Sequence, residues 1–194
     1  AFAFQGLLQV LHFSENLTIQ SMHSTASVQR SSFSFAQTQQ YALPTLFALF
    51  GLIMGSWAGR IPALAERVQV SHSALSMVLL CGGLGAVLSY PVSSFLMGRF
   101  GARKSLLVSG MALLAVLVSI GMAPTVPRLM LAVLMLGITA STFDVAINSA
   151  ATRREKQTGK SELSMLHGIG CAGGLAGATL GSLMASMKIA PATH

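Results

Sequence analysis

The sequence predicts an all-α protein, a polytopic membrane helix bundle with about five transmembrane helices. The first observation is composition: 53% of the 194 residues are hydrophobic and 9% are charged, whereas a soluble domain carries about 25% charged residues. The second is that uncharged stretches recur at about the 20 residues that a bilayer span requires. These features exclude a disordered chain, a disulfide-rich secreted domain and a typical cytosolic enzyme.

Apolar stretches with few charges define the expected elements in order. Spans are expected near residues 41–61, 73–97, 105–123, 128–150 and 163–187, within a bundle covering residues 41–188. Residues 1–40, rich in Ser, Thr and Gln, are interpreted as a polar N-terminal tail, and residues 189–194 as a truncated end. The chain begins with Ala1 and stops soon after an apolar run. We therefore expect a fragment that lacks a sixth helix, because polytopic transporters commonly pair their repeats.

Basic residues in the connecting segments predict the orientation. The segments after the second and fourth spans hold seven basic residues, Arg99, Arg103, Lys104, Arg153, Arg154, Lys156 and Lys160. The alternate segments hold three, Arg60, Arg67 and Arg128. Cytoplasmic loops carry the excess of Lys and Arg, so the N-terminus is expected in the cytoplasm. The net charge of +7 does not predict nucleic-acid binding, because the basic residues lie in short gaps between apolar runs.

The segment between the second and third spans carries a family motif. It reads Gly98-Arg99-Phe100-Gly101-Ala102-Arg103-Lys104 and resembles the corresponding loop in the N-terminal half of major facilitator superfamily transporters. The matching residues are Arg99, Gly101, Arg103 and Lys104, and the resemblance implies that they form a gating loop. In the alternative interpretation, the basic residues act only as topology signals on the cytoplasmic side. The chain departs from the family pattern at Ser94, Gly98 and Ala102.

Further segments indicate one branch of that superfamily. Residues 55–62 (GSWAGRIP), residues 144–148 (DVAIN) and His167-Gly168 are similar to the bacterial rhizopine-transport-like and fucose-permease-like members. The resemblance covers about residues 41–187. It implies a secondary transporter of the bacterial inner membrane that moves a sugar-like or other small polar molecule by alternating access. It also implies that the remainder of the transporter is missing from this chain.

One polar cluster is expected within the spans. Asp144 is the only acidic residue inside a span, and intramembrane carboxylates are usually functional. Asn148 lies one helical turn later on the same face, and His167 is expected at a similar depth on the fifth span. These three residues are candidates for proton coupling or substrate contact. In the alternative interpretation, Asp144 pairs with Arg153, Arg154 or a basic residue of the 98–104 segment and holds the helix ends together.

A second candidate site lies on the first span. Trp57 and Arg60 follow Phe50 and Met54 at helical spacing, and they could close a cavity or bind an anionic or hydroxylated substrate. The alternative is an interfacial Trp–Arg anchor, which bilayers favour.

No catalytic, metal or cofactor site is predicted. Cys81 and Cys171 lie inside apolar runs, and no phosphate-binding loop, zinc-ligand spacing or nucleophile–base pattern is present. The expected partners are the lipid bilayer, a small-molecule substrate and protons. The alternative function is a non-transporting membrane scaffold or accessory protein, or an inactive truncated gene product.

Overall fold

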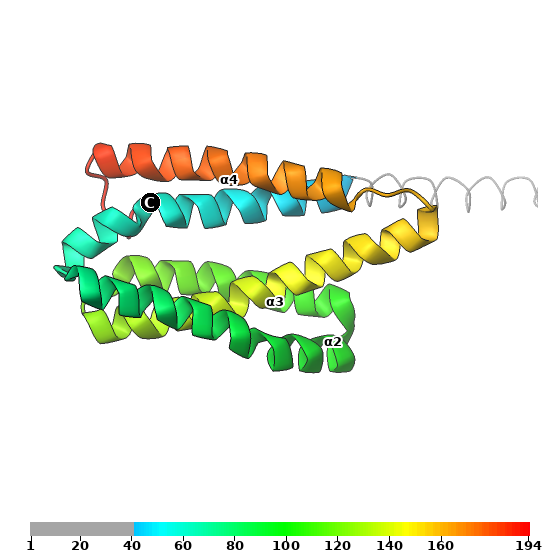
Figure 1. The fold of residues 1–194 in the computed structure, drawn as a ribbon, viewed down its shortest axis with the longest axis horizontal. Coiled ribbons are helices and arrows are strands. Elements are labelled where there is room, and N and C mark those ends of the chain that lie inside the picture. Colours follow the sequence, from blue (N-terminus) through cyan, green and yellow to red (C-terminus); the bar gives the residue numbers. More distant parts are fainter. Residues whose placement is uncertain (1–40) are drawn as a thin grey trace, which may run out of the picture. The chain divides into compact units, whose positions relative to one another are not determined.

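Long helices account for most of the chain that the structure describes. The computed structural model describes residues 41–194, and the polar tail predicted for residues 1–40 lies outside them. The helices are Tyr41–Val68 (the first helix), α2 (His72–Met122), α3 (Val126–Thr158) and α4 (Leu163–Ser186) (Figure 1). All four are long and apolar enough to cross a membrane. No strand occurs among residues 41–194, and the predicted all-α membrane helix bundle is confirmed.

Helix α2 consists of two arms that run in opposite directions (Figure 1). Gly101 separates residues 72–100, the first arm, from residues 102–122, the second arm, with non-helical φ of 76° and ψ of 164°. This conformation is open to glycine, which has no Cβ to clash with the backbone. The hydroxyl of Ser105 donates to the carbonyl oxygen of Gly101 at 2.8 Å. The two stretches expected as separate spans, 73–97 and 105–123, therefore lie on different arms of α2.

The first helix continues past the expected end of its span. It reaches Val68, whereas the sequence suggested an end near residue 61. Arg60 was expected in a connecting segment. It lies inside the helix and is buried. Beyond it, the Arg67 guanidinium donates to the carbonyl oxygen of Gly121 and joins this end of the first helix to the end of α2.

The ends of α2 and α3 have local explanations in the sequence. The Ser71 hydroxyl accepts from the backbone N–H of Ala74 at 3.3 Å, which satisfies one of the free donors at the start of α2. Helix α3 has Pro127 in its first turn, where the missing N–H costs no helical hydrogen bond. It ends at Gly159, whose φ of 68° is left-handed, as is common after a helix C-terminus.

A single carboxylate connects α3 to the start of α4. Glu155 Oε1 accepts from the backbone N–H groups of Glu162 and Leu163 at 2.6 and 2.7 Å. Arg154 Nε lies 3.0 Å from Glu162 Oε2 in a salt bridge. These contacts satisfy backbone donors that a helix N-terminus leaves without partners, and they fix the short connection between the two helices.

The helices pack as two parallel pairs through glycines. The first helix lies beside α4, where a Cβ added at Gly51 or Gly55 would overlap the carbonyl oxygen of Gly170 or Gly174. The first arm of α2 lies against α3, where a Cβ at Gly85 would overlap the carbonyl oxygen of Leu134. Backbones approach this closely only where side chains are absent, as is typical of packed membrane helices.

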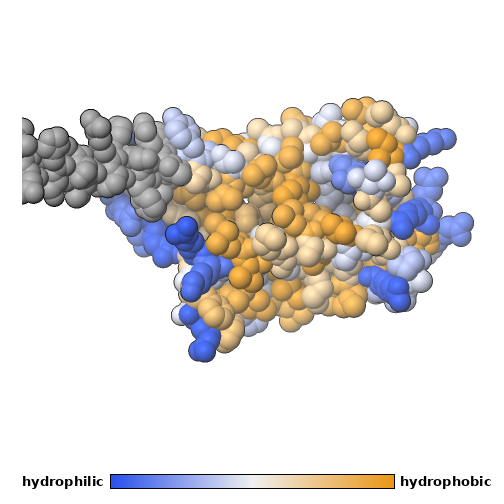
Figure 2. Space-filling view, turned by 180° about the vertical axis from the view of Figure 1, so that it is seen from behind, coloured by the Kyte–Doolittle hydropathy of each residue, from blue (hydrophilic) through white to orange (hydrophobic). Residues whose placement is uncertain are grey.

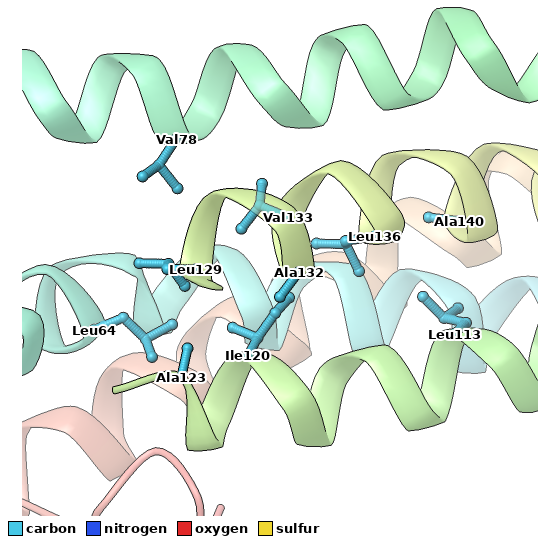
Figure 3. Packing of buried hydrophobic residues seen from close by; sticks show 10 residues of the cluster. All are labelled: Leu64, Val78, Leu113, Ile120, Ala123, Leu129, Ala132, Val133, Leu136 and Ala140. Atoms are coloured by element: carbon cyan, nitrogen blue, oxygen red, sulfur yellow. The ribbon is translucent and has the colours of Figure 1, made fainter. Parts of the chain in front are cut away.

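The apolar core lies between the two arms of α2, α3 and the end of the first helix (Figure 3). Val78 from the first arm points toward α3, and Leu64, Ile120 and Leu129 come together from three helices (Figure 3). Outside this core, many large apolar side chains are exposed. They form a broad hydrophobic band between hydrophilic ends (Figure 2), the surface expected of a protein surrounded by lipid.

Candidate functional site

The structure brings Asp144, Asn148 and His167 together, and we call these three residues the Asp144 cluster. Asn148 Nδ2 donates to the Asp144 carboxylate (Oδ1) at 3.0 Å and to its backbone carbonyl at 2.9 Å. His167, from the first turns of α4, is close enough to interact electrostatically with the Asp144 carboxylate. Asp144 is half-buried. Residues from α3 and α4 thus meet at one carboxylate.

The Asp144 carboxylate forms no ion pair with an arginine or lysine among residues 41–194, and Arg154, on the same helix, binds Glu162. A carboxylate with a histidine and an amide as its partners can take up and release a proton without first breaking a strong salt bridge.

Aromatic rings from the first helix lie beside the Asp144 cluster. The rings of Phe47 and His167 are edge to face, with centroids 5.3 Å apart. Phe50 contacts Phe143, the residue before Asp144, at the same centroid distance of 5.3 Å. The first helix therefore contacts both helices that supply the cluster, and a shift of this helix would change the surroundings of His167.

Arg60 and Trp57 line a cavity at the opposite end of the first helix, which we call the Arg60 cavity. Its volume is about 400 Å³. Its walls come from the first helix, the second arm of α2, α4 and the segment after α4: Leu52, Ile53, Ser56, Trp57, Arg60, Leu64, Leu117, Ile120, Gly121, Leu180, Pro191 and His194. Most of the walls are apolar, and the polar groups are confined to a few side chains.

The Arg60 guanidinium is buried and only partly satisfied. Its residue is 4% exposed, and Nη2 donates to the carbonyl oxygen of Ile189. Nε and Nη1 have no hydrogen-bond partner among residues 41–194. Nearby, Ser56 Oγ and His194 Nε2 are 3.2 Å apart. An interfacial anchor would keep its charge in water or among headgroups, whereas this charge lies between helices.

The predicted gating residues lie around the turn in α2 and belong to neither the Asp144 cluster nor the Arg60 cavity. Arg99, Arg103 and Lys104 are exposed, and Gly101 supplies the change of direction. The exposed ring of Phe100 contacts Phe95 edge to face, with centroids 6.5 Å apart. The structure thus places the basic residues on the surface of one end of the bundle.

Several important residues were missed by the sequence analysis. The spacing of Gly51, Gly55 and Gly59 at intervals of four was a usable signal for the contact with α4. The contact of Phe47 with His167, and the closure of the Arg60 cavity by Pro191 and His194, had no such signal. They depend on which helices become neighbours.

Three comparisons bear on the family. No family model matches the chain, and no solved structure matches it significantly. Among curated proteins, an uncharacterized transporter of Sinorhizobium fredii is 33% identical over 135 residues, which are 70% of this chain and 36% of the relative. An uncharacterized MFS-type transporter of Yersinia pestis is 31% identical over 141 residues, 73% of this chain and 37% of the relative.

A third relative is the membrane protein MosC of Rhizobium meliloti, 27% identical over 131 residues, which are 68% of this chain and 32% of the relative. The chain spans about a third of the length of these curated relatives. The chain is therefore homologous to a segment of major facilitator superfamily transporters, which confirms the resemblance predicted from its motifs.

Proposed function

We propose that this chain is part of a proton-coupled secondary transporter that carries a small polar organic solute by alternating access. Two of the relatives are named as transporters, and they supply the general function. The observation that carries the coupling mechanism is the Asp144 cluster. In it, a carboxylate within an apolar helix meets a histidine from α4 and, among residues 41–194, forms no ion pair with a lysine or arginine.

The cluster could couple proton transfer to movement because it joins two helices. When Asp144 is ionised, it interacts electrostatically with His167 and accepts from Asn148. When Asp144 takes up a proton, its electrostatic attraction to His167 on α4 weakens. The first helix contacts His167 through Phe47, so the packing of this helix against α4 also becomes weaker. Burying the charged carboxylate without partners in lipid is costly, so protonation and helix movement are linked.

We also propose the orientation in the bacterial inner membrane. The end of the bundle that contains Gly101 and the connection between α3 and α4 faces the cytoplasm, because most of the basic connecting residues lie there. The Arg60 cavity then lies toward the outer side. In this orientation the N-terminus of the transmembrane bundle is cytoplasmic.

Proton-linked transport in liposomes tests the proposal. The native protein, produced with all residues that its gene encodes, is reconstituted with the pH dye pyranine inside, and glucose, L-fucose or glucuronate is added outside. We expect at least one solute to move protons and Asp144→Asn to abolish that movement. The matched control is Glu66→Gln, which removes an exposed carboxylate from the first helix and leaves proton movement unchanged.

The results separate the competing functions. Solute movement that persists in Asp144→Asn with the same proton flux would remove the coupling role from this residue. No movement of any solute by the wild-type protein, with intact helicity, would instead favour a scaffold or accessory role.

A further inference from the structure

We infer that the Arg60 cavity binds the carboxylate group of a small organic anion, with the rest of the ligand packed against Trp57 and the apolar walls. The inference rests on the proposed function, because the bound anion is then the solute, and it names the chemical class of that solute. It rests on the burial and the unsatisfied hydrogen-bond donors of the Arg60 guanidinium rather than on the volume of the cavity.

The buried positive charge of Arg60 favours a negatively charged ligand. Arginine stays protonated in proteins, so Arg60 carries a full positive charge although its residue is 4% exposed. Among the described residues, no carboxylate forms an ion pair with it. A buried and uncompensated charge is strongly destabilising. A ligand that brings a negative charge into the cavity removes this penalty, whereas a neutral ligand leaves it in place.

The hydrogen bonds of the Arg60 guanidinium favour a carboxylate. The one satisfied group, Nη2, is held by the carbonyl oxygen of Ile189, so the guanidinium is oriented before a ligand arrives. Nε and Nη1 have no partner among residues 41–194. These two groups point to different sides of the guanidinium, so neither pairs with the other. Nη2 carries two N–H groups and Ile189 takes one of them, so the second can complete a fork with either Nε or Nη1. A guanidinium recognises planar oxyanions through such paired N–H groups, and the remaining fork suits the oxygens of a carboxylate.

The walls of the Arg60 cavity suit an apolar ligand body. Around Arg60, the walls include Trp57, Leu64, Leu117 and Ile120, and a volume of about 400 Å³ is available. Binding sites for small molecules combine apolar walls with a few oriented polar groups. The ligand is therefore expected to carry a compact apolar body next to its carboxylate. The Ser56–His194 pair supplies a polar contact at the edge of the cavity.

Trp57 provides a direct readout, because the chain contains one tryptophan and it lines this cavity. The 194-residue chain is placed in phosphatidylcholine nanodiscs and titrated with cyclohexanecarboxylate, which does not absorb at the excitation wavelength. The neutral isostere cyclohexanecarboxamide is the matched ligand control. We expect saturable changes in Trp57 fluorescence for the carboxylate and at least tenfold weaker binding of the amide.

Two variants and one charge control identify the responsible group. Arg60→Gln is expected to weaken carboxylate binding by about 100-fold, because charge-assisted hydrogen bonds are lost. Arg60→Lys keeps the charge but not the planar fork, and it is expected to weaken binding by about tenfold. Arg128→Gln, which removes an exposed arginine at the start of α3, is expected to leave binding unchanged. Helical circular dichroism checks that each variant is folded.

Three outcomes would overturn the inference. The first is equal binding of carboxylate and amide, and the second is unchanged carboxylate binding in folded Arg60→Gln. The third is displacement of the carboxylate by phosphatidylglycerol in the nanodisc, because this would identify a lipid headgroup as the occupant. Failure of this binding test is separate from failure of the proposed function. A protein that moves protons with a neutral sugar but ignores the carboxylate keeps the transport function and loses this substrate class.

Discussion

The Asp144 cluster and the Arg60 cavity are two different solutions to one physical problem, a charged side chain within a membrane protein. Asp144 is half-buried and has partners from its own protein, Asn148 at 3.0 Å and the nearby His167. Arg60 is more deeply buried, yet two of its donors have no hydrogen-bond partner among residues 41–194. The charge of Asp144 therefore has partners within the described residues, whereas we propose that an external anion compensates the charge of Arg60.

In the two proposals above, this difference separates proton coupling from ligand recognition. A carboxylate whose partners are a histidine and an amide can take up and release a proton without breaking a strong salt bridge. A group that cannot lose its proton and lacks partners is best suited to meeting an anion. The two sites share a structural element, because the first helix carries Arg60 and contacts His167 through Phe47. Movement of this one helix against α4 is therefore a physical route between them.

The largest effect is expected from breaking that shared element with Gly55→Leu. A side chain at this position would overlap the backbone of Gly174, and overpacking of this kind costs about 3 kcal/mol or more. We expect a large loss of monodisperse protein and loss of both proton movement and Trp57-detected binding. Gly83→Leu is the matched control, since a Cβ there meets nothing within 4 Å. Normal function of Gly55→Leu would show that the sites do not depend on this contact.

The next effect tests whether the two sites are separable. Asp144→Asn removes the titrating carboxylate but keeps a polar partner for Asn148, so proton movement should be lost. The affinity of the Arg60 cavity for cyclohexanecarboxylate, measured by Trp57 fluorescence, should change less than about twofold, the scale of distant and independent sites. A tenfold change in that affinity would mean that the sites are strongly coupled in binding.

A smaller effect is expected at the turn of α2, outside both sites. Gly101 has φ of 76° and ψ of 164°, a backbone region that is open essentially to glycine alone and costs another residue about 1–3 kcal/mol. We expect Gly101→Ala to lower the thermal unfolding midpoint in detergent while carboxylate binding persists. Gly98→Ala is the matched control, because a Cβ there also meets nothing within 4 Å and its φ is not positive. Equal midpoints for the two variants would contradict a role for the left-handed backbone.

The smallest effect is expected for Asn148→Ala. It removes one side-chain hydrogen bond to the Asp144 carboxylate, which is worth about 1 kcal/mol. We expect a small fall in the unfolding midpoint and a modest fall in the rate of proton movement, with the Arg60 cavity unaffected. Complete loss of proton movement would instead make Asn148 as important to coupling as Asp144.

The class of this protein and its candidate residues could be predicted from the amino-acid sequence. Low charge and long apolar runs require helices in lipid, because backbone groups must be satisfied within the chain. The spacing of Asp144 and Asn148 put them one turn apart on one face, which any α-helix enforces. The helical register likewise placed Trp57 and Arg60 on a common stripe, whatever the stripe would face.

The surroundings of that stripe and the pairing of the helices could not be predicted, because they depend on tertiary packing. Arg60 belongs to a helix that runs on to Val68, and the segment after α4 covers it through Ile189. The pairing of the first helix with α4 brought Phe47 to His167, although these residues are far apart in the chain. Local patterns fix a helix and its faces through backbone geometry. The partner of each face depends on which close packing satisfies all helices at once, and that is a property of the whole bundle.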